Sequence, residues 1–440
     1  MKKMLSVLLA SAMAISAVGS LAACGKEDSK TIVVWAPQAA INGYESIIAE
    51  WKDANPDYKD YTVTFNAVDE GEVETKLNTD ASNGADVFFF EAGQIAGLQE
   101  KNLLQNLGAE VTAEIKARDE ESWYNPVMNG TTAVAFPTTA DNGYFLWYDS
   151  TVFTADDVKS LDKMVEIAKE KDKNIMFDYA NGWYLPTFWF GDAGCIMDYV
   201  EDDYVTDIDN DTGKAVAKAV NALLGPDNNK MKNGKPCIIK QSKDLNSEIG
   251  TGFASGTVAA GVIGTWVAED IETKMSKDEN NKPHDDYKRT DGATYDDIKC
   301  AKLPSLKVGT NDYQMGSFMG GKYCGVNAQK KTGNIAVSIS LANFLTGERG
   351  QAKRFETTKA GPTNKKVAAT SAVQENKALA ALSAQNAAGG YLQLQQSSNF
   401  WTAWETFGNG IYAGDTTTKA TLSETALMTA LSTLATTIKT

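Results

Sequence analysis

The chain has 440 residues, of which 43% are hydrophobic and 9% aromatic, a composition typical of globular proteins. Its formal net charge is -15 at pH 7, and because such a surface repels phosphate, we exclude nucleic acid and anionic lipid surfaces as partners. The one histidine, His284, lies in a polar, proline-containing stretch that predicts an exposed loop, which excludes serine and cysteine triads with a histidine base.

The N-terminus has the pattern of an export signal. Two lysines precede an apolar run over residues 4–18, and small residues then lead to Cys24. This order is typical of bacterial lipoproteins, so we predict that residues 1–23 are removed and that Cys24 carries the lipid. Residues 24–30 would form a tether on the extracytoplasmic face of the cell membrane, with the lipid as the only membrane contact. A membrane-spanning helix is the alternative, but the apolar run is barely long enough.

Beyond the tether, predicted strands and helices alternate. The predicted strands are apolar or alternating runs at 31–35, 62–68, 85–90, 145–148 and 174–177. Helical patterns lie between them, around 47–51, 72–77 and 161–169. The alternation predicts an α/β fold with covered, largely parallel sheets. Roughly 415 residues are more than one hydrophobic core usually accommodates, so we expect two lobes. Ligands of such sheets bind at loops after the strand ends, here 36–43, 68–72 and 91–95.

Three other segments have a recognisable local pattern. Residues 207–213 are similar to a calcium loop, but the glycine is one place late and the closing glutamate is missing, so a turn before a helix is predicted instead. Residues 277–297 are charged and predict an exposed insertion. Near the C-terminus, Thr421 and Glu424 fit a capping box before an apolar helix face formed by Leu427, Leu431, Leu434 and Ile438.

The cysteines after the tether give no sign of a metal or redox site. Cys195, Cys237, Cys300 and Cys324 are widely spaced and form no C-x-x-C pair. Three disulfide pairings are possible, and four buried free thiols are equally consistent with the spacing. With one histidine as well, the sequence predicts no metal and no cofactor.

Aromatic residues are concentrated in a few segments. Residues 179–190 hold six in twelve positions, and Trp266 and Trp401 follow glycine-rich and glutamine-rich stretches, respectively. Packing in a core is one explanation. The other is carbohydrate stacking, because a pyranose ring has apolar CH faces that cover an aromatic ring and hydroxyls that need amide or carboxylate partners.

Five motifs resemble one known family. They are GYFLWYDSTVF at 143–153, GFASGTVAAGVIGTW at 252–266, KLPS at 302–305, NFLTGERGQ at 343–351 and GPT at 361–363. Their order and spacing span nearly all of residues 31–440. The chain resembles the solute-binding proteins of carbohydrate ABC importers, and within them the maltodextrin-binding type.

The resemblance implies a two-lobed clamp with a hinge, in which each lobe is a central sheet flanked by helices. Residues 31–140 and 322–371 would form the first lobe, and 141–321 and 372–440 the second. Matching segments imply tryptophan stacking surfaces and polar partners for an oligosaccharide in the cleft, at Phe90, Glu91, Gln94, Asn142, Asn181, Trp183, Trp266 and Trp401.

The implied function is that of a monomeric receptor that hands an oligosaccharide to an ABC permease and performs no bond chemistry. An α-glucan is the predicted ligand. Relatives that bind maltodextrin often place an Asp-Arg pair where this chain has Gly93-Gln94, and an acidic residue near Asn181. A xylo- or galacto-oligosaccharide therefore stays open as the ligand. The alternative from another class is a lipid-anchored glycoside hydrolase with two carboxylates.

Overall fold

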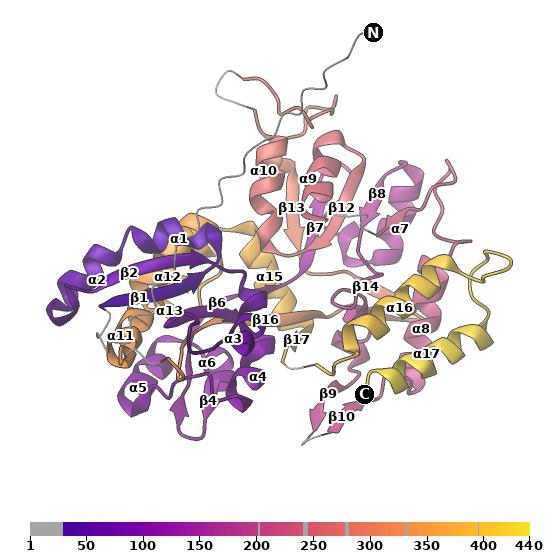
Figure 1. Ribbon diagram of the computed structural model, residues 1–440. Helices are drawn as coiled ribbons and strands as arrows, with labels where there is room; N and C mark the ends of the chain where they lie inside the picture. Colours follow the sequence, from indigo (N-terminus) through magenta and orange to yellow (C-terminus); the bar gives the residue numbers. More distant parts are fainter. Residues whose placement is uncertain (1–29, 201–202, 241–244, 278–280, 331–332, 395) are drawn as a thin grey trace, which may run out of the picture.

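The computed structural model describes residues 30–200, 203–240, 245–277, 281–330, 333–394 and 396–440. Two main sheets, each covered by helices, form two lobes that lie side by side in Figure 1. The fold is therefore the predicted two-lobed α/β architecture. The predicted signal peptide, Cys24 and most of the tether lie outside the described residues. Within the described residues, no helix has the length and apolar character needed to span a bilayer.

The sheet of the first lobe has the strand order β17-β16-β3-β1-β2, and β6 also pairs with β16. Its parallel part joins β1 to β2 and β3, whereas β16 runs antiparallel to β3 and β6. The strands are β1 (Thr31–Ala36), β2 (Thr62–Ala67), β3 (Val87–Glu91), β6 (Ala135–Gly143), β16 (Ser317–Val326) and β17 (Gly390–Leu392).

The position of strand β3 between two apolar clusters explains why its sequence is a continuous apolar run. Phe89 packs into an apolar cluster with Tyr44 and residues of α11 (Ile335–Leu345), whereas Phe88 and Phe90 pack into a second cluster. Alternate side chains of a strand point to opposite faces, so both faces of this central strand are buried. The other helices of this lobe are α1 (Gln38–Glu45), α2 (Ile48–Ala54), α3 (Val73–Thr79), α4 (Ile95–Glu100), α5 (Gly108–Arg118), α6 (Glu121–Tyr124), α12 (Glu348–Thr358), α13 (Lys365–Ala368) and α14 (Ser371–Gln374).

The sheet of the second lobe has the order β11-β8-β12-β7-β13. Its strands are β7 (Phe145–Asp149), β8 (Asn174–Met176), β11 (Ile238–Ile239), β12 (Val258–Ile263) and β13 (Ile298–Ala301). All six residues of β12 are buried, because it lies in the middle of a covered sheet. The helices are α7 (Leu161–Glu170), α8 (Asp211–Leu224), α9 (Leu245–Ser255), α10 (Ala268–Met275), α15 (Lys377–Gly389), α16 (Phe400–Ala413) and α17 (Glu424–Thr437). Short hairpins add β4 (Met128–Asn129) with β5 (Thr132–Ala133), β9 (Met197–Val200) with β10 (Asp203–Thr206), and β14 (Ser305–Val308) with β15 (Asn311–Gln314).

Two long strands connect the lobes. In and just after β6, Phe136 belongs to a first-lobe cluster and Tyr144 to the core of the second lobe. In β16, Phe318 packs in the second lobe and Tyr323 in the first. The chain returns once more at β17, which lies in the segment predicted for the second lobe but pairs with the start of β16 and so extends the first sheet. Backbone hydrogen bonds to residues 317–319 place it there, and no local pattern marks such a pairing.

For the C-terminal helix, the prediction of the buried apolar face is confirmed, whereas the prediction of the N-cap residue is wrong. Its apolar residues Leu427, Leu431 and Leu434 are at most 3% exposed. The helix begins at Glu424, and the Ser423 hydroxyl accepts the backbone hydrogen bond from Ala426. The predicted capping box at Thr421 is therefore wrong by two residues, because Thr421 instead accepts from the backbone of Asp227.

The four cysteines after the tether are free, and three of them are buried. Burial raises the pKa of the Cys195 thiol to about 12 and that of Cys237 to about 11. Such thiols stay protonated at neutral pH and pack as small apolar groups. The disulfide alternatives are wrong for this structure.

Candidate ligand-binding site

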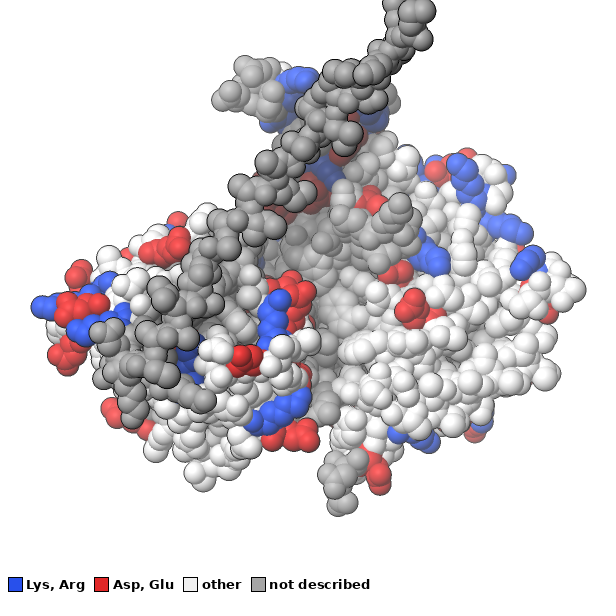
Figure 2. Space-filling model, in the orientation of Figure 1, with Lys and Arg blue, Asp and Glu red and all other residues white. Residues whose placement is uncertain are grey.

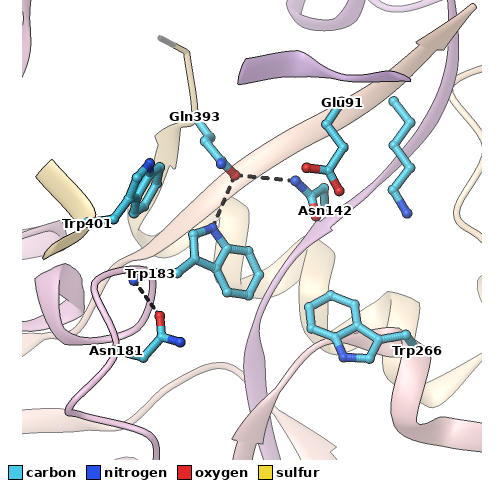
Figure 3. A pocket seen from close by; sticks show the side chains of 8 residues that line it. Glu91, Asn142, Asn181, Trp183, Trp266, Gln393 and Trp401 are labelled. Atoms are coloured by element: carbon cyan, nitrogen blue, oxygen red, sulfur yellow. Dashed lines mark hydrogen bonds between the residues drawn. The ribbon is translucent and has the colours of Figure 1, made fainter. Parts of the chain in front are cut away.

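Residues of both lobes line a cavity of about 460 Å³. Figure 2 shows the surface hollowed between the two lobes, and Figure 3 shows the cavity from close by. From the first sheet come Glu91 at the end of β3, Asn142 of β6, Lys322 of β16 and Gln393 after β17. The second lobe contributes Asn181, Trp183, Trp266 and Trp401. Six of the eight residues predicted from the sequence thus lie around one cavity.

The second-lobe wall is aromatic. The rings of Trp183 and Trp266 are 5.7 Å apart at a tilt of 39°. Buried Phe318 stacks on Trp183 at 6.5 Å and contacts Trp401 at 5.7 Å. Trp266 is 41% exposed and Trp401 37%, which is unusual for side chains of this size. The wall therefore presents large apolar ring surfaces that the fold does not cover.

Two glycines allow this wall to form. A side chain at Gly264 would come within 2.0 Å of the Trp266 ring, so the ring occupies space that only glycine leaves free. A side chain at Gly182 would lie 2.4 Å from the backbone oxygen of Trp401, so glycine lets the loop carrying Trp183 approach the start of α16. These contacts explain physically why glycine accompanies Trp183 and Trp266 in the sequence.

Gln393 connects the two walls. Its side-chain oxygen accepts hydrogen bonds from Asn142 Nδ2 at 3.3 Å and from Trp183 Nε1 at 3.1 Å (Figure 3). Its backbone N–H donates to the Met319 carbonyl at 2.8 Å. On the second-lobe side, the Asn181 Oδ1 accepts from the Trp183 backbone N–H at 2.8 Å. The indole of Trp183 is therefore held by hydrogen bonds as well as by packing, with part of its ring surface on the cavity.

The first-lobe wall is charged. Lys322 Nζ lies 3.3 Å from Glu70 Oε2, and Arg354 donates to Glu70 Oε1 at 2.9 Å. Burial opposes ionisation of Glu70, but Arg354 and Lys322 together lower its pKa below the usual range. Burial raises the pKa of Glu91, against the opposing charge of Lys322. The wall thus offers one carboxylate acceptor and one ammonium donor, backed by a buried ion-pair network.

Phe90 and Gln94, both predicted to contact a ligand, do not line the cavity. Phe90 is fully buried in the first lobe. Gln94 is 9% exposed; its Nε2 donates to the Glu70 carbonyl at 2.8 Å, and its Oε1 accepts from the Glu74 N–H at 2.9 Å. Both residues support the turn that carries Glu91. Neither side chain reaches the cavity in this structure, because strand alternation turns Phe90 into the core and the backbone of the neighbouring turn uses the Gln94 amide.

Two residues that line the cavity, Lys322 and Gln393, are not among those predicted from the sequence. Gln393 opens a short glutamine-rich stretch that could have been considered for an amide contact. Lys322 stands among apolar and glycine residues of a long strand with no local signal. It reaches the cavity only because β16 pairs with β3, which places Lys322 opposite Glu91.

A two-lobed α/β body with a cavity between the lobes, lined by three tryptophans and five polar side chains, is typical of a small-molecule binding protein. Residues 46–381 match the family model of bacterial extracellular solute-binding proteins, and the chain belongs to that family.

Individual relatives agree with this assignment. A galactooligosaccharide-binding protein of Bacillus subtilis (strain 168) is 23% identical over 396 residues, covering 83% of each chain. Among solved structures, the maltodextrin binding protein MalE1 from L. casei BL23 superposes with a TM-score of 0.74 at 20% identity, covering 93% of this chain and 99% of its own. The GacH receptor of Streptomyces glaucescens has a TM-score of 0.69 at 18% identity, covering 92% and 96%. At these identities the structural likeness supports the fold.

Replacing Glu91 with glutamine is expected to weaken oligosaccharide binding about tenfold or more without lowering stability. A hydrogen bond to a charged group contributes about 1.5–3 kcal/mol, and glutamine offers a weaker acceptor. Because burial raises the pKa of Glu91 above 4.5 in the folded protein, its ionisation opposes folding at neutral pH, and the variant should melt at the same or a higher temperature.

Titration calorimetry across pH checks this result. Wild-type affinity should fall as the pH decreases through the raised pKa of Glu91, since the carboxylate takes up a proton there. The glutamine variant should lack that pH dependence. Equal affinities of the two proteins at pH 7 would show that Glu91 makes no contact with the sugar.

Proposed function

We propose that the protein is a lipid-anchored receptor that captures an oligosaccharide between its lobes and delivers it to the membrane subunits of an ABC importer. The single observation that supports this most is the cavity itself, in which three tryptophans of one lobe face a carboxylate, two amides and an ammonium group of the other. Aromatic faces match the CH faces of sugar rings, and the polar groups match their hydroxyls.

The arrangement also suggests how binding is signalled. A ligand shifts an equilibrium between lobe arrangements only if it contacts the closed form better than the open one. A sugar that stacks on Trp266 and Trp401 and also bonds to Glu91 and Asn142 contacts both lobes, so it favours closure. The closed pair of lobes is then the form that the importer recognises.

Bond cleavage does not fit the described cavity. The two-carboxylate mechanism of glycoside hydrolysis needs an acid and a second carboxylate on either side of the scissile bond. Among the described residues that line the cavity, Glu91 is the one carboxylate. We therefore propose that the sugar is bound and released intact.

An α-glucan fragment is the ligand we favour. MalE1 from L. casei is titled a maltodextrin binding protein, and the GacH receptor was solved in complex with acarbose. A galacto-oligosaccharide is the second candidate, because the Bacillus subtilis relative is a galactooligosaccharide-binding protein. The protein would act as a monomer at the extracytoplasmic face of the membrane, held there by lipid on Cys24.

The test is calorimetric titration of residues 25–440 with malto-, galacto- and xylo-oligosaccharides, followed by chromatography of the recovered sugar. We expect saturable binding of one series, best the malto series, and recovery of the sugar at its original length. Shortened sugar would identify an enzyme, and no binding by any series would overturn the oligosaccharide receptor.

A further inference from the structure

A row of aromatic rings in contact with one another begins at Trp401 in the cavity and continues beyond it. Phe400 contacts Trp401 at 4.8 Å, Tyr204 contacts Phe400 at 6.3 Å, and Tyr199 contacts Tyr204 at 5.1 Å. Phe400 is fully buried and Tyr204 is 7% exposed, so these two rings belong to the fold. Tyr199 is 36% exposed, close to the value of Trp401. An exposed ring thus recurs at the far end of the row.

Tyr199 lies on the β9–β10 hairpin, whose inner face is fixed to the body of the second lobe. Tyr199 and Tyr204 are directly opposite each other in the hairpin register and share that face with Met197, which is fully buried. The exposed ring of Tyr199 is therefore on the side that turns toward the protein. Figure 1 shows the hairpin next to β17 and the C-terminal end of α17.

The hairpin is attached to the same segment that lines the cavity. The Tyr391 hydroxyl donates to the Met197 carbonyl at 2.7 Å and accepts from the Met197 N–H at 3.0 Å. The Tyr204 hydroxyl donates to Gln396 Oε1, which leaves the Gln396 Nε2 as a donor. Gln393 and Trp401 of this segment line the cavity. A single stretch of chain therefore joins the cavity to the hairpin.

We propose that Tyr199 and Gln396 form an additional sugar subsite outside the main cavity, which binds the distal units of an oligosaccharide too long for the cavity alone. The ring of Tyr199 supplies the stacking surface and the Gln396 amide supplies a hydroxyl partner. This inference rests on the proposed function and adds to it that the receptor prefers long chains. Packing alone does not account for Tyr199, because its ring keeps an exposed surface and its hydroxyl has no hydrogen bond among the described residues.

The experiment compares affinities for a short and a long sugar of one series. Maltotriose and maltoheptaose are titrated into the wild type and the Tyr199→Ala variant, with galacto- and xylo-oligosaccharides of matching lengths in parallel. Losing one stacking partner should weaken maltoheptaose binding about tenfold and leave maltotriose binding unchanged. Tyr199→Phe, which keeps the ring, should retain most of the affinity for the long sugar.

Tyr412→Ala is the matched control, because Tyr412 is a 38% exposed tyrosine of α16 outside the cavity lining. It should change neither affinity. An equal loss for both sugars in Tyr199→Ala, or no loss for either, would overturn the additional subsite while leaving the receptor intact. If the wild type bound no series at all, the proposed function would fail, and this inference with it.

Discussion

Replacing Trp266 and Trp401 together with alanine should lower the affinity for the bound oligosaccharide by about 100-fold or more. Each ring is expected to behave as a binding hot spot of about 2 kcal/mol, or roughly 30-fold, and the two effects need not add fully because both rings contact one ligand. The fold should persist, because both side chains are more than a third exposed. Titration calorimetry and a thermal melt of the same preparation measure the two effects.

The control for this double variant is again Tyr412→Ala, which removes an equally exposed ring from the helix that carries Trp401. It should bind sugar like the wild type. Unchanged affinity in the double variant would mean that the tryptophans do not stack on the ligand. The thermal melt would identify a variant that fails to fold.

Replacing Glu70 with glutamine should reduce the free energy of unfolding by about 3–5 kcal/mol, the usual cost of removing one partner from a buried ion pair. Glu70 is 5% exposed and accepts from both Arg354 and Lys322, so the substitution removes the carboxylate that pairs directly with two cations. The substitution should also weaken sugar binding, because Lys322 lines the cavity. Urea unfolding monitored by circular dichroism gives the stability difference.

The pH dependence of that difference follows from the pKa of Glu70. Although burial acts in the opposite direction, Arg354 and Lys322 hold this pKa below 4.5 in the folded protein. The stability from the ionised carboxylate is therefore present above pH 4.5 and is lost as the pH falls through the lowered folded pKa. The difference between wild type and variant should shrink over that acid range.

Glu50→Gln is the matched control for Glu70→Gln. Glu50 pairs with Arg349 at 2.6 Å, but both side chains are close to half exposed, so solvent screens the pair. Its substitution should change stability very little. If Glu70→Gln were equally harmless, the buried network would not stabilise the first lobe.

Where the signal was local, the sequence predicted the architecture well. The runs that became β1, β3, β7 and β8 are apolar or alternating and lie between clear turns, so periodicity alone located them. The aromatic segments offered carbohydrate stacking as one of two explanations, and the receptor function followed from the resemblance of five motifs to the solute-binding family. The resemblance then directed attention to Trp183, Trp266 and Trp401, which the structure brings to one cavity.

What the sequence could not supply depends on pairing between distant segments. Lys322 lies opposite Glu91 because β16 pairs with β3 across more than two hundred residues of chain. Gln393 reaches Asn142 because β17 joins the first sheet, a pairing with no local pattern. For Phe90 and Gln94, a matching segment located the loop correctly, but only the strand register and the backbone partners decide which side chains face the cavity.

The most direct test of the central claim is a crystal structure of residues 25–440 with the oligosaccharide that binds most tightly. We expect a sugar between the lobes, with rings stacked on Trp266 and Trp401, hydroxyls bonded to Glu91 and Asn142, and every glycosidic bond intact. A ligand bound elsewhere on the protein, or in contact with one lobe alone, would contradict it.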